Sequence, residues 1–278
     1  MTSILITGAA KGIGRATALH LDKLGFTVIA GVRSAADADS LRQAASPRFH
    51  TLQLDITHDD HIAALHDAVA AIVGSGGLDG LVNNAGVAVA APLEFVPITE
   101  FRRQIEVNLT AQLAVIQTVL PLLRQAKGRI INVSSIGGRI AGPMLGAYHA
   151  SKFALEGLTD SLRQELAPWG LQVVSIEPGA IATPIWDSGT QTADRLQAQM
   201  SPQAQTYYAA AFEWARNFAK TSTAKGLPPE RVAEVITTAL TAAQPRTRYP
   251  VGRDAQIGTH IIARLPDRLR DRLMAARG

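Results

Sequence analysis

Seven short apolar runs, rich in β-branched residues, alternate with stretches of helical periodicity along this chain. The apolar runs fall at residues 3–7, 26–31, 49–54, 79–83, 128–134, 171–177 and 247–251. Helical patterns fall near 13–24, 58–74, 99–125, 146–167, 229–242, 255–264 and 267–276. Because two parallel strands need a crossover between them, usually a helix, this alternation predicts an α/β fold. We expect a doubly wound, seven-stranded parallel sheet with helices on both faces.

The length of the chain, 278 residues, is compatible with one domain. α/β folds of about 200–250 residues are often single domains, and no repeat or low-complexity linker divides this sequence. We therefore expect residues 1–278 to form a single Rossmann-type domain. In such a sheet ligands bind beyond the carboxyl ends of the strands, so functional residues are expected there.

Residues 184–226 break the alternation, because they contain no strand pattern. Connections of this length are typical of lids and binding loops. The aromatic residues of the segment are Tyr207, Tyr208, Phe212, Trp214 and Phe218, together with Trp186 near its start. We expect a substrate-binding lid at about 184–226, and helix core is the alternative interpretation of the aromatic set at 207–218.

The net charge of +4 is concentrated at one end of the chain. Residues 245–278 hold eight Arg and three Asp, a net charge of +5, so the other 244 residues carry −1. A basic tail on a near-neutral body is not typical of a nucleic-acid-binding face, so we expect no nucleic-acid partner. The tail, about 252–278, is expected to form a helical extension that packs its leucines on the body or on a second subunit, rather than on a membrane.

Neither a secretory signal nor a membrane span is evident. The N-terminal residues lack a basic region and a long apolar stretch. The most membrane-like run, 107–123, includes several polar residues and favours a buried or subunit-facing helix. The absence of Cys excludes disulfides and thiolate metal sites. We expect a cytoplasmic homodimer or homotetramer.

The first apolar run leads directly into a glycine-rich turn, residues 8–14, which is followed at once by a helical pattern. Glycines let backbone N–H groups approach a pyrophosphate, and the helix N-terminus complements its charge. The spacing G-x-x-x-G-x-G differs from the usual dinucleotide fingerprint, so a plain tight turn is the alternative. Later strand ends bring Asp55 and the small residues around Asn84 to the same edge, with room for a base or a ribose; Asn84 could equally be a turn residue.

The end of the second strand favours a phosphorylated dinucleotide. An NAD-binding unit commonly has an acid here that bonds the adenosine ribose, but this chain has Val32 followed by Arg33. Arg33, with Lys11 of the glycine turn, could face a 2′-phosphate. We therefore expect NADP(H) to be preferred and NAD(H) to be possible, with two ordinary surface charges as the alternative.

Three polar residues after the fifth strand have the spacing of an acid–base site. Ser135 ends the strand, and Tyr148 and Lys152 lie four residues apart, on one face of an expected helix. A free Tyr has a pKa of about 10, which a nearby ammonium group would lower toward neutral pH. Ser135 would then hydrogen-bond the reacting oxygen. An exposed helix pair is the alternative, and the ordered occurrence of these motifs on one α/β frame argues against it.

Two histidine features are given no chemical role. Segment 58–66 contains three histidines, but Thr57 and Asp60 form a variant capping box that would begin a helix and leave them in solvent. We therefore expect no metal site. His149 falls on a different helix face from Tyr148 and is expected to be a packing or interface residue.

The motifs together resemble the short-chain dehydrogenase/reductase family over about residues 2–184. The matching motifs are Thr7-Gly8-x-x-x-Gly12-Ile13-Gly14, Asn83-Asn84-Ala85-Gly86, Asn108, Ser135, Tyr148-x-x-x-Lys152 and Pro178-Gly179-x-x-x-Thr183. Residues 134–139 and 151–157 look most like the hydroxysteroid and retinol dehydrogenase branch.

The resemblance implies a role for each matched residue. Tyr148 would be the general acid/base, and Ser135 would orient the substrate carbonyl or alcohol. Lys152 would lower the pKa of Tyr148 and bind the nicotinamide ribose, while Asn108 would help hold a proton-relay water near Lys152. Asp55 would contact adenine. The expected cofactor contacts are Gly8, Lys11, Gly12, Ile13, Gly14, Arg33, Asp55, Asn84, Ala85, Gly86, Tyr148, Lys152, Pro178, Gly179 and Thr183.

The expected function is an NADP(H)-dependent oxidoreductase that interconverts a secondary alcohol and a ketone on an apolar molecule of about steroid or retinoid size. Its pocket is expected to comprise the aromatic set at 207–218 and the apolar residues Ile136, Pro143, Met144, Ile185 and Trp186. A 3-oxoacyl thioester reductase and a non-catalytic dinucleotide sensor are the alternatives. The intact set of Ser135, Tyr148 and Lys152 argues against the sensor.

Overall fold

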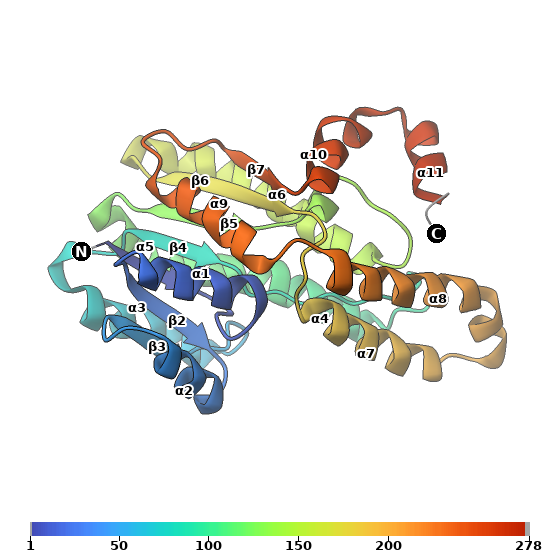
Figure 1. The fold of residues 1–278 in the computed structure, drawn as a ribbon, viewed down its shortest axis with the longest axis horizontal. Helices are drawn as coiled ribbons and strands as arrows, with labels where there is room; N and C mark the ends of the chain where they lie inside the picture. Colours follow the sequence, from blue (N-terminus) through green and yellow to red (C-terminus); the bar gives the residue numbers. More distant parts are fainter. Residues whose placement is uncertain (1, 276–278) are drawn as a thin grey trace.

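Seven parallel strands form one sheet in the order β3-β2-β1-β4-β5-β6-β7 in the structure, a computed structural model that describes residues 2–275 (Figure 1). The strands are Ser3–Ile6 (β1), Thr27–Val32 (β2), Phe49–Gln53 (β3), Gly80–Asn83 (β4), Arg129–Val133 (β5), Gln172–Pro178 (β6) and Arg248–Val251 (β7). In the middle of the sheet, Ile6 of β1 pairs with Ala30 of β2 on one side and with Val82 of β4 on the other. The doubly wound parallel sheet predicted from the sequence is confirmed.

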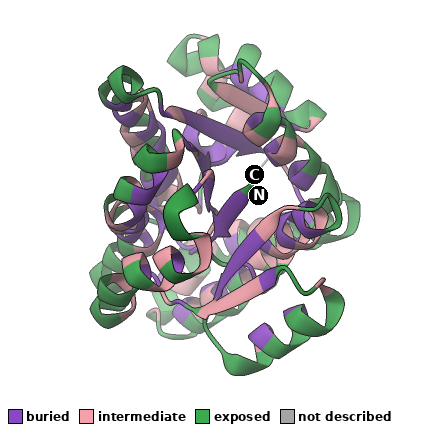
Figure 2. Ribbon diagram, turned by 90° about the vertical axis from the view of Figure 1, so that its left-hand side faces the viewer, coloured by how far each residue is buried: buried purple, intermediate pink, exposed green. Residues whose placement is uncertain are grey.

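Alternate residues of the strands face two separate apolar layers. Ile4 and Ile6 of β1 join a cluster with α1 and α9, whereas Leu5 joins a cluster with α3, α5 and α6. The helices of the two layers are α1 (Gly12–Lys23), α3 (Asp59–Val73), α5 (Ala111–Ala126), α6 (Gly146–Leu166) and α9 (Pro229–Thr241). Figure 2 shows the buried strands enclosed by helices whose outer faces are exposed. Successive residues of a strand point to opposite faces of the sheet, and both faces are covered by helices. The strands are therefore apolar at almost every position.

The helix predicted at 99–125 contains a wider turn in its middle. Helix α4 (Ile98–Ile105) runs into a π-helical turn, Glu106–Thr110, which continues as α5. By length and composition alone, Ile98–Ala126 is long and apolar enough to cross a membrane, and less than half of its most apolar window is buried. Its inner face nevertheless buries Gln104, Asn108 and Gln112 completely.

Helix α2 (Ala35–Ala44) is an element that the sequence analysis did not predict. Ser34 begins it, because its hydroxyl accepts a hydrogen bond from the backbone N–H of Asp37 at 3.2 Å. Only Ala38 and Leu41 of this helix are buried, so its apolar periodicity is too sparse to predict a helix.

The predicted capping box at the start of α3 is wrong. His58 is the N-cap residue and makes no side-chain cap, whereas the Thr57 hydroxyl donates to Asp55 Oδ1 at 2.7 Å. The expectation that the histidines point into solvent also fails for His61, whose Nδ1 accepts the backbone N–H of Asp55 at 3.0 Å. Asp55, two residues after the end of β3, binds both side chains: its carboxylate accepts from Thr57 and its backbone N–H donates to His61.

The segment without a strand pattern is a helical hairpin of α7 (Ile185–Ala198) and α8 (Pro202–Lys225). The two helices lie side by side beyond one end of the sheet (Figure 1). Phe212 of α8 is 1% exposed and packs in a small cluster with Met144 and Ala193. Two contacts join α8 to the segment before α4: the Tyr208 hydroxyl donates to Glu94 at 2.7 Å, and the Tyr208 ring meets Phe95 edge-on.

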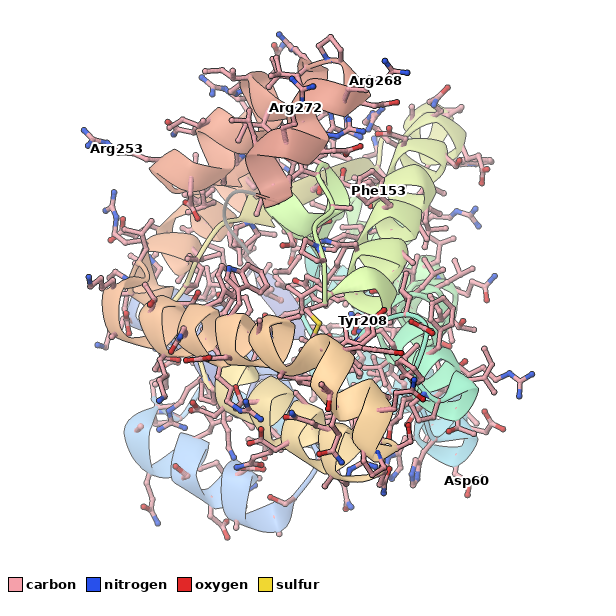
Figure 3. All side chains as sticks on the ribbon, turned by 90° about the vertical axis from the view of Figure 1, so that its right-hand side faces the viewer. Asp60, Phe153, Tyr208, Arg253, Arg268 and Arg272 are labelled. Atoms are coloured by element: carbon pink, nitrogen blue, oxygen red, sulfur yellow. The ribbon has the colours of Figure 1, made fainter. Side chains whose placement is uncertain are left out.

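Two helices form the basic extension, α10 (Arg253–His260) and α11 (Asp267–Ala275). The expectation that α11 packs its leucines on the body is wrong for the single chain, since Leu269 and Leu273 are 46% and 42% exposed. Arg268 and Arg272 of α11 are exposed as well, at the top of the molecule in Figure 3. Residues 276–278 of the predicted extension lie outside the described residues.

Candidate active site

The glycine-rich turn brings β1, α1 and the end of β4 into close contact. Gly8 and Gly12 have φ angles of +64° and +54°, which side chains other than glycine rarely adopt. A Cβ on Gly14 would stand 2.4 Å from the Gly8 carbonyl oxygen, and a Cβ on Gly8 would stand 2.9 Å from Ala85 Cα. The glycines are therefore required by the geometry of the turn itself.

The first turn of α1 is suited to an anion. Lys11 occupies the N-cap position without a side-chain cap, so no side chain at the N-cap competes for the N–H groups at Gly12, Ile13 and Gly14. A Cβ on Gly12 would stand only 3.2 Å from Thr183, which shows that the loop after β6 lies beside the turn. The turn and this loop together fit the pyrophosphate and nicotinamide ends of a dinucleotide.

Asn84 holds the glycine turn rather than its own backbone. Its Nδ2 donates to the carbonyl oxygens of Thr7 at 3.0 Å and Gly8 at 3.1 Å. The Thr7 hydroxyl in turn accepts the backbone N–H groups of Asn84 and Ala85. These bonds tie the carboxyl ends of β1 and β4 together, so the alternative of a local turn residue at Asn84 is wrong.

The residues expected at the adenosine end lie at adjacent strand ends. Arg33 is exposed and its charge is close enough to Asp55 to affect its titration. Although burial works to raise it, hydrogen bonds from Thr57 and the charge of Arg33 hold the pKa of Asp55 below its usual value. Val32 is only 1% exposed, whereas Lys11 is exposed at the start of α1. The two cations are thus accessible, and the last residue of β2, Val32, is apolar and buried.

Ser135, Tyr148 and Lys152 meet where β5 and α6 come together. Lys152 Nζ lies 5.9 Å from the centre of the Tyr148 ring and donates to the Val133 carbonyl oxygen at 2.8 Å. The Ser135 side chain hydrogen-bonds Tyr148 and also accepts the backbone N–H of Gly137 at 2.9 Å. A Cβ on Gly137 would stand 3.1 Å from the Tyr148 ring, so this glycine allows the close approach.

Burial governs the titration of Tyr148 and Lys152. Burial raises the pKa of Tyr148 above its ordinary value, and the hydrogen bond from Ser135 works to lower it. Burial also lowers the pKa of Lys152 to about 8, which the Glu156 carboxylate opposes. The ammonium group of Lys152 is directed to a backbone carbonyl and both side chains are desolvated, so burial dominates the pKa of Tyr148 in the chain by itself. The lowering of this pKa by Lys152 and a bound cationic ring stays a prediction.

His149 packs against the turn that contains Gly137. Its Nδ1 lies 2.9 Å from the Gly137 carbonyl oxygen, and burial lowers its pKa. Its ring is edge-on to that of Tyr148, with the two centres 6.0 Å apart. These contacts are those of a packing residue, as the sequence analysis predicted.

Asn108 lies in the π-helical turn and is completely buried. Its Oδ1 accepts the Val87 N–H at 2.9 Å, and its Nδ2 donates to the Val87 carbonyl oxygen and to Ser151 Oγ, both at 3.0 Å. Asn108 therefore connects the segment after β4 to α6, one residue before Lys152. π turns are often found at functional positions in helices.

The loop from Pro178 to Thr183 depends on a residue that the sequence analysis missed. Asp254, in the first turn of α10, accepts the Ala180 N–H at 2.7 Å, and its carboxylate lies where a Cβ on Gly179 would stand. Thr183 itself is buried beside Gly12. An acid at a helix start was the sequence signal, but 74 residues separate Asp254 from Ala180.

An apolar cavity lies between the hairpin and the segment after β4. Its lining residues are Ala88, Ala90, Leu145, Trp186, Gly189, Thr190, Ala193, Trp214, Ala215, Arg216, Phe218 and Ala219. Trp186 is edge-on to Phe218 at 5.3 Å, and Phe218 stacks on Trp214 at 5.5 Å, so three aromatic rings form one wall. Leu145, the N-cap residue of α6, is one of the lining residues, so the cavity reaches the start of α6.

The predicted pocket residues are divided by the structure. Trp186 lines the cavity, whereas Met144 is buried in the cluster behind it. Ile136 packs on Gly258 of α10, and Pro143 is exposed at the surface. Ile185 is half-buried at the start of α7. The aromatic set at 207–218 divides in the same way: Trp214 and Phe218 line the cavity, Phe212 is core, and Tyr207 and Tyr208 lie outside.

Comparison with known proteins agrees with this geometry. The family model of the short chain dehydrogenases matches residues 2–194. Retinol dehydrogenase 5 of Mus musculus is 40% identical over 277 residues, which cover 98% of this chain and 87% of that protein. An NADPH-dependent 3-dehydrocapnine reductase of Ornithobacterium rhinotracheale is 35% identical, with 98% of this chain and 96% of that protein covered.

The fold is also shared with a solved structure. A short chain dehydrogenase from Burkholderia cenocepacia, in complex with NADP, superimposes with a TM-score of 0.75 and 25% identity. The match covers 98% of this chain and 97% of that one. The chain therefore belongs to the short-chain dehydrogenase family of dinucleotide-dependent oxidoreductases.

Proposed function

We propose that the protein is an NADP(H)-dependent oxidoreductase that interconverts a secondary alcohol and a ketone on an apolar substrate. The observation that carries this proposal is the grouping of Ser135, Tyr148 and Lys152. The segment after β4 connects Lys152 to the glycine-rich turn, and the N-cap residue of α6, Leu145, lines the apolar cavity. A dinucleotide bound from the turn toward Thr183 would supply or accept the hydride, and its oxidised ring would add a positive charge beside Tyr148.

The chain's own residues would handle the proton and the oxygen. Tyr148 is the acid/base: its phenol donates a proton to the ketone oxygen, or takes one from the alcohol. The Ser135 hydroxyl donates a hydrogen bond to the same oxygen and orients it. Lys152, with a pKa of about 8, is largely protonated at neutral pH and stabilises the phenolate form. Asn108 positions the Lys152 turn of α6 through Ser151 and helps hold a proton-relay water.

Exposed cations at the adenosine end support a preference for NADP(H). Arg33 and Lys11 are accessible, and no carboxylate stands at position 32 to bond a bare ribose. One relative's name describes an NADPH-dependent reductase, and the Burkholderia structure holds NADP.

The cavity supports an apolar substrate, and we propose that the hairpin α7–α8 is the lid above it. Trp186 joins the lid to the loop after β6, because its Nε1 donates to the Ile181 carbonyl oxygen at 2.8 Å. A ring or chain entering the cavity would contact three aromatic side chains and several alanines. The wall is apolar, as retinoids and steroids require, and a relative is named retinol dehydrogenase 5.

We further propose a cytoplasmic homodimer or homotetramer without a membrane span. The apolar helix Ile98–Ala126 is less than half buried in its most apolar window, which suits a contact between subunits. Phe153 of α6 is 44% exposed and would be covered in the same way.

A substrate panel tests the proposed function. Steroids, retinoids, aliphatic ketones and 3-oxoacyl thioesters are each offered with NADPH and with NADH, and cofactor oxidation is followed by absorbance. We expect turnover of apolar ketones with NADPH at the highest kcat/KM. Fastest turnover of the thioesters would replace the proposal by an acyl reductase, and cofactor binding without any turnover would replace it by a dinucleotide sensor.

A further inference from the structure

The buried side-chain amides of Gln104, Asn108 and Gln112 each hydrogen-bond the backbone of residues 85–89, the segment that follows β4. Gln112 Nε2 donates to the Ala85 carbonyl oxygen at 2.7 Å, and Asn108 makes two bonds with Val87. Gln104 Oε1 accepts the Val89 N–H at 2.8 Å, and its Nε2 donates to the Val87 carbonyl oxygen at 2.7 Å. All three amides are completely buried. We call these residues the amide ladder.

The spacing of the ladder matches the spacing of the segment it holds. Four residues of a helix advance about 6 Å, and two residues of an extended chain advance about 6–7 Å. Each step from Gln112 to Asn108 to Gln104 therefore reaches the next alternate residue, from Ala85 through Val87 to Val89.

The π-helical turn keeps the three amides of the ladder on one side of the helix. In an uninterrupted α-helix, a step of four residues rotates about 40° past a full turn, so successive amides would drift around the helix. The turn at Glu106–Thr110 is wider and rotates the chain less per residue. This offsets the drift and leaves the three amides facing one segment.

The bonded segment connects the two halves of the site. At one end, Ala85 contacts the glycine turn, and a Cβ on Gly86 would stand 3.9 Å from Lys152 Nζ. At the other end, Ala88 and Ala90 line the apolar cavity. Among the described residues, the side chains that hydrogen-bond the backbone of residues 85–90 are Gln104, Asn108 and Gln112, together with Thr7 at the Ala85 N–H.

We propose that Gln104 and Gln112 are positioning residues that set the substrate cavity in register with the cofactor site. Gln112 fixes the cofactor end of the segment, and Gln104 fixes the cavity end. The proposal rests on the proposed function, since it assigns the two ends to cofactor and substrate. Both residues act through the backbone and touch neither reactant.

Exchange of each glutamine for methionine tests the assignment, because methionine keeps the length and removes the hydrogen bonds. We expect Gln112→Met to raise KM and Kd for NADPH by about 2- to 10-fold, and to change KM for the ketone less. We expect Gln104→Met to raise KM for the ketone by about 2- to 10-fold and to leave the NADPH Kd near that of the unaltered protein. Kd is measured by fluorescence without turnover, so it remains informative if the proposed substrate class is wrong.

Two matched controls separate positioning from folding. Gln117→Met changes an exposed glutamine of the same helix and should alter neither constant. Asn132→Leu removes a buried amide that bonds Thr159 and Asn83 rather than the segment, and should lower the melting temperature without separating the two constants. If both ladder variants raise the two constants equally, or only lower the melting temperature, the ladder is structural and the proposal is wrong.

A second variant protects the test against poor folding. Glutamate at position 104 cannot donate to Val87 when ionised, but when protonated it offers one donor and one acceptor. For Gln104→Glu we therefore expect the ketone KM, relative to the unaltered protein, to fall as the pH is lowered from 8 to 5. A ratio that stays constant with pH would overturn the role of Gln104.

Discussion

Helices α6 and α8 differ in how firmly they are held, although they have similar lengths. Helix α6 buries eight of its 21 residues, including the polar Ser151, Lys152, Glu156 and Thr159, whereas α8 buries four of its 24. Several side-chain hydrogen bonds of α6 are buried, for example Asn132 to Thr159 at 2.9 Å. Those of α8 are exposed or partly buried, for example Tyr208 to Glu94 at 2.7 Å.

The difference between the two helices suggests different roles, with α6 serving turnover and α8 serving substrate affinity. A buried polar network holds its members in one arrangement, because breaking it leaves unsatisfied groups. Exposed ion pairs such as Arg195 with Glu100, which joins α7 to α4, contribute about 0–1 kcal/mol each. We infer that substitutions around α6 change turnover, and that substitutions in the hairpin change the affinity for substrate.

The largest effect is expected at Tyr148. Tyr148→Phe keeps the ring that packs on Gly137 and removes only the phenolic hydroxyl group, with its proton and its hydrogen bond to Ser135. Loss of a positioned acid/base reduces turnover by about 100- to 10,000-fold. Turnover is measured at saturating substrate, and NADPH binding, measured by fluorescence, should stay near normal.

A tyrosine on the other helix provides the control. Tyr207 of α8 is 68% exposed, so Tyr207→Phe should leave turnover unchanged. If Tyr148→Phe keeps more than about a tenth of the turnover while chemistry limits the rate, Tyr148 does not carry the proton.

A smaller effect is expected at Arg33, at the cofactor end of the site. Arg33→Ala should reduce the preference for NADPH over NADH by about tenfold, because a charge-assisted hydrogen bond to the 2′-phosphate is lost. The effect should shrink as salt is added, since Arg33 is exposed. kcat/KM with each cofactor, at low and high salt, measures it.

The structure determines which variants are informative here. Val32→Asp would bury a carboxylate at a position that is 1% exposed, so a loss of activity would not report on ribose binding. Arg48→Ala, at an exposed arginine before β3, is the better control and should leave the cofactor ratio unchanged. An Arg33→Ala protein with the original ratio at low salt would show that Arg33 is only a surface charge.

Residues that act at short range were predictable from the sequence. Gly8, Gly12 and Gly14 follow one strand, and Tyr148 and Lys152 share one helix face, so local spacing defines their geometry. The seven strands were predictable for the same reason, because each is a short apolar run between turns.

Residues that act across the fold were not predictable. Gln104 and Gln112 stand eight residues apart in a helix, but their partners lie 15 to 27 residues earlier in the chain. A polar residue at every fourth position of an apolar helix was the available signal. For Asp254 the signal was an acid at a helix start, which does not identify its partner, because the contact with Ala180 depends on how α10 meets the end of β6.

A still smaller effect on activity is expected for a substitution in the hairpin α7–α8. Trp186→Ala removes the edge-on contact with Phe218 and the hydrogen bond to Ile181. Such an aromatic pair contributes about 0.5–1.5 kcal/mol, so KM for a bulky apolar ketone should rise by about 2- to 10-fold with little change in kcat. Trp169→Ala, at a tryptophan that is 53% exposed beside Arg124, is the control. A fall in kcat with unchanged KM would contradict the separation of α6 from the hairpin.

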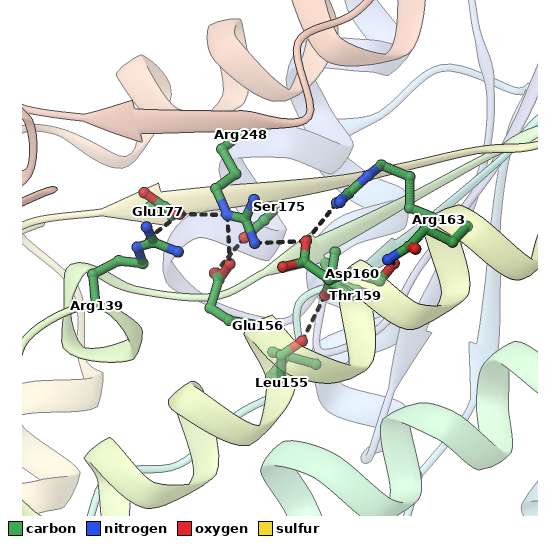
Figure 4. A network of polar contacts seen from close by, with 11 residues as sticks. Arg139, Leu155, Glu156, Thr159, Asp160, Arg163, Ser175, Glu177 and Arg248 are labelled. Atoms are coloured by element: carbon green, nitrogen blue, oxygen red, sulfur yellow. Dashed lines mark hydrogen bonds and ion pairs between the residues drawn. The ribbon is translucent and has the colours of Figure 1, made fainter. Parts of the chain in front are cut away.

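A charged cluster lies behind α6, on the side of β6 and β7 (Figure 4). Arg248 lies between three carboxylates: Glu156 at 3.0 Å, Asp160 at 2.6 Å and Glu177 at 3.3 Å. Arg139 approaches Glu177 from the turn after Ser135, at 3.9 Å. Burial raises the pKa of Glu177 to about 7, the Glu156 charge adds to this, and Arg139 opposes it.

Glu177→Gln should therefore change stability and leave catalysis within about twofold, the smallest of the four effects on activity. Between pH 4.5 and about 7 the folded protein holds a proton on Glu177 that the unfolded chain has released, so this group's contribution to stability falls as the pH rises. The amide of the variant cannot titrate, and its free energy of unfolding relative to the unaltered protein should rise by about 2 kcal/mol from pH 5 to pH 8. Urea unfolding at the two pH values measures this difference, with Glu165→Gln at an exposed position of α6 as the control. Parallel stability curves would show that Glu177 titrates near its ordinary value, and a raised KM would show that the cluster also reaches the substrate site.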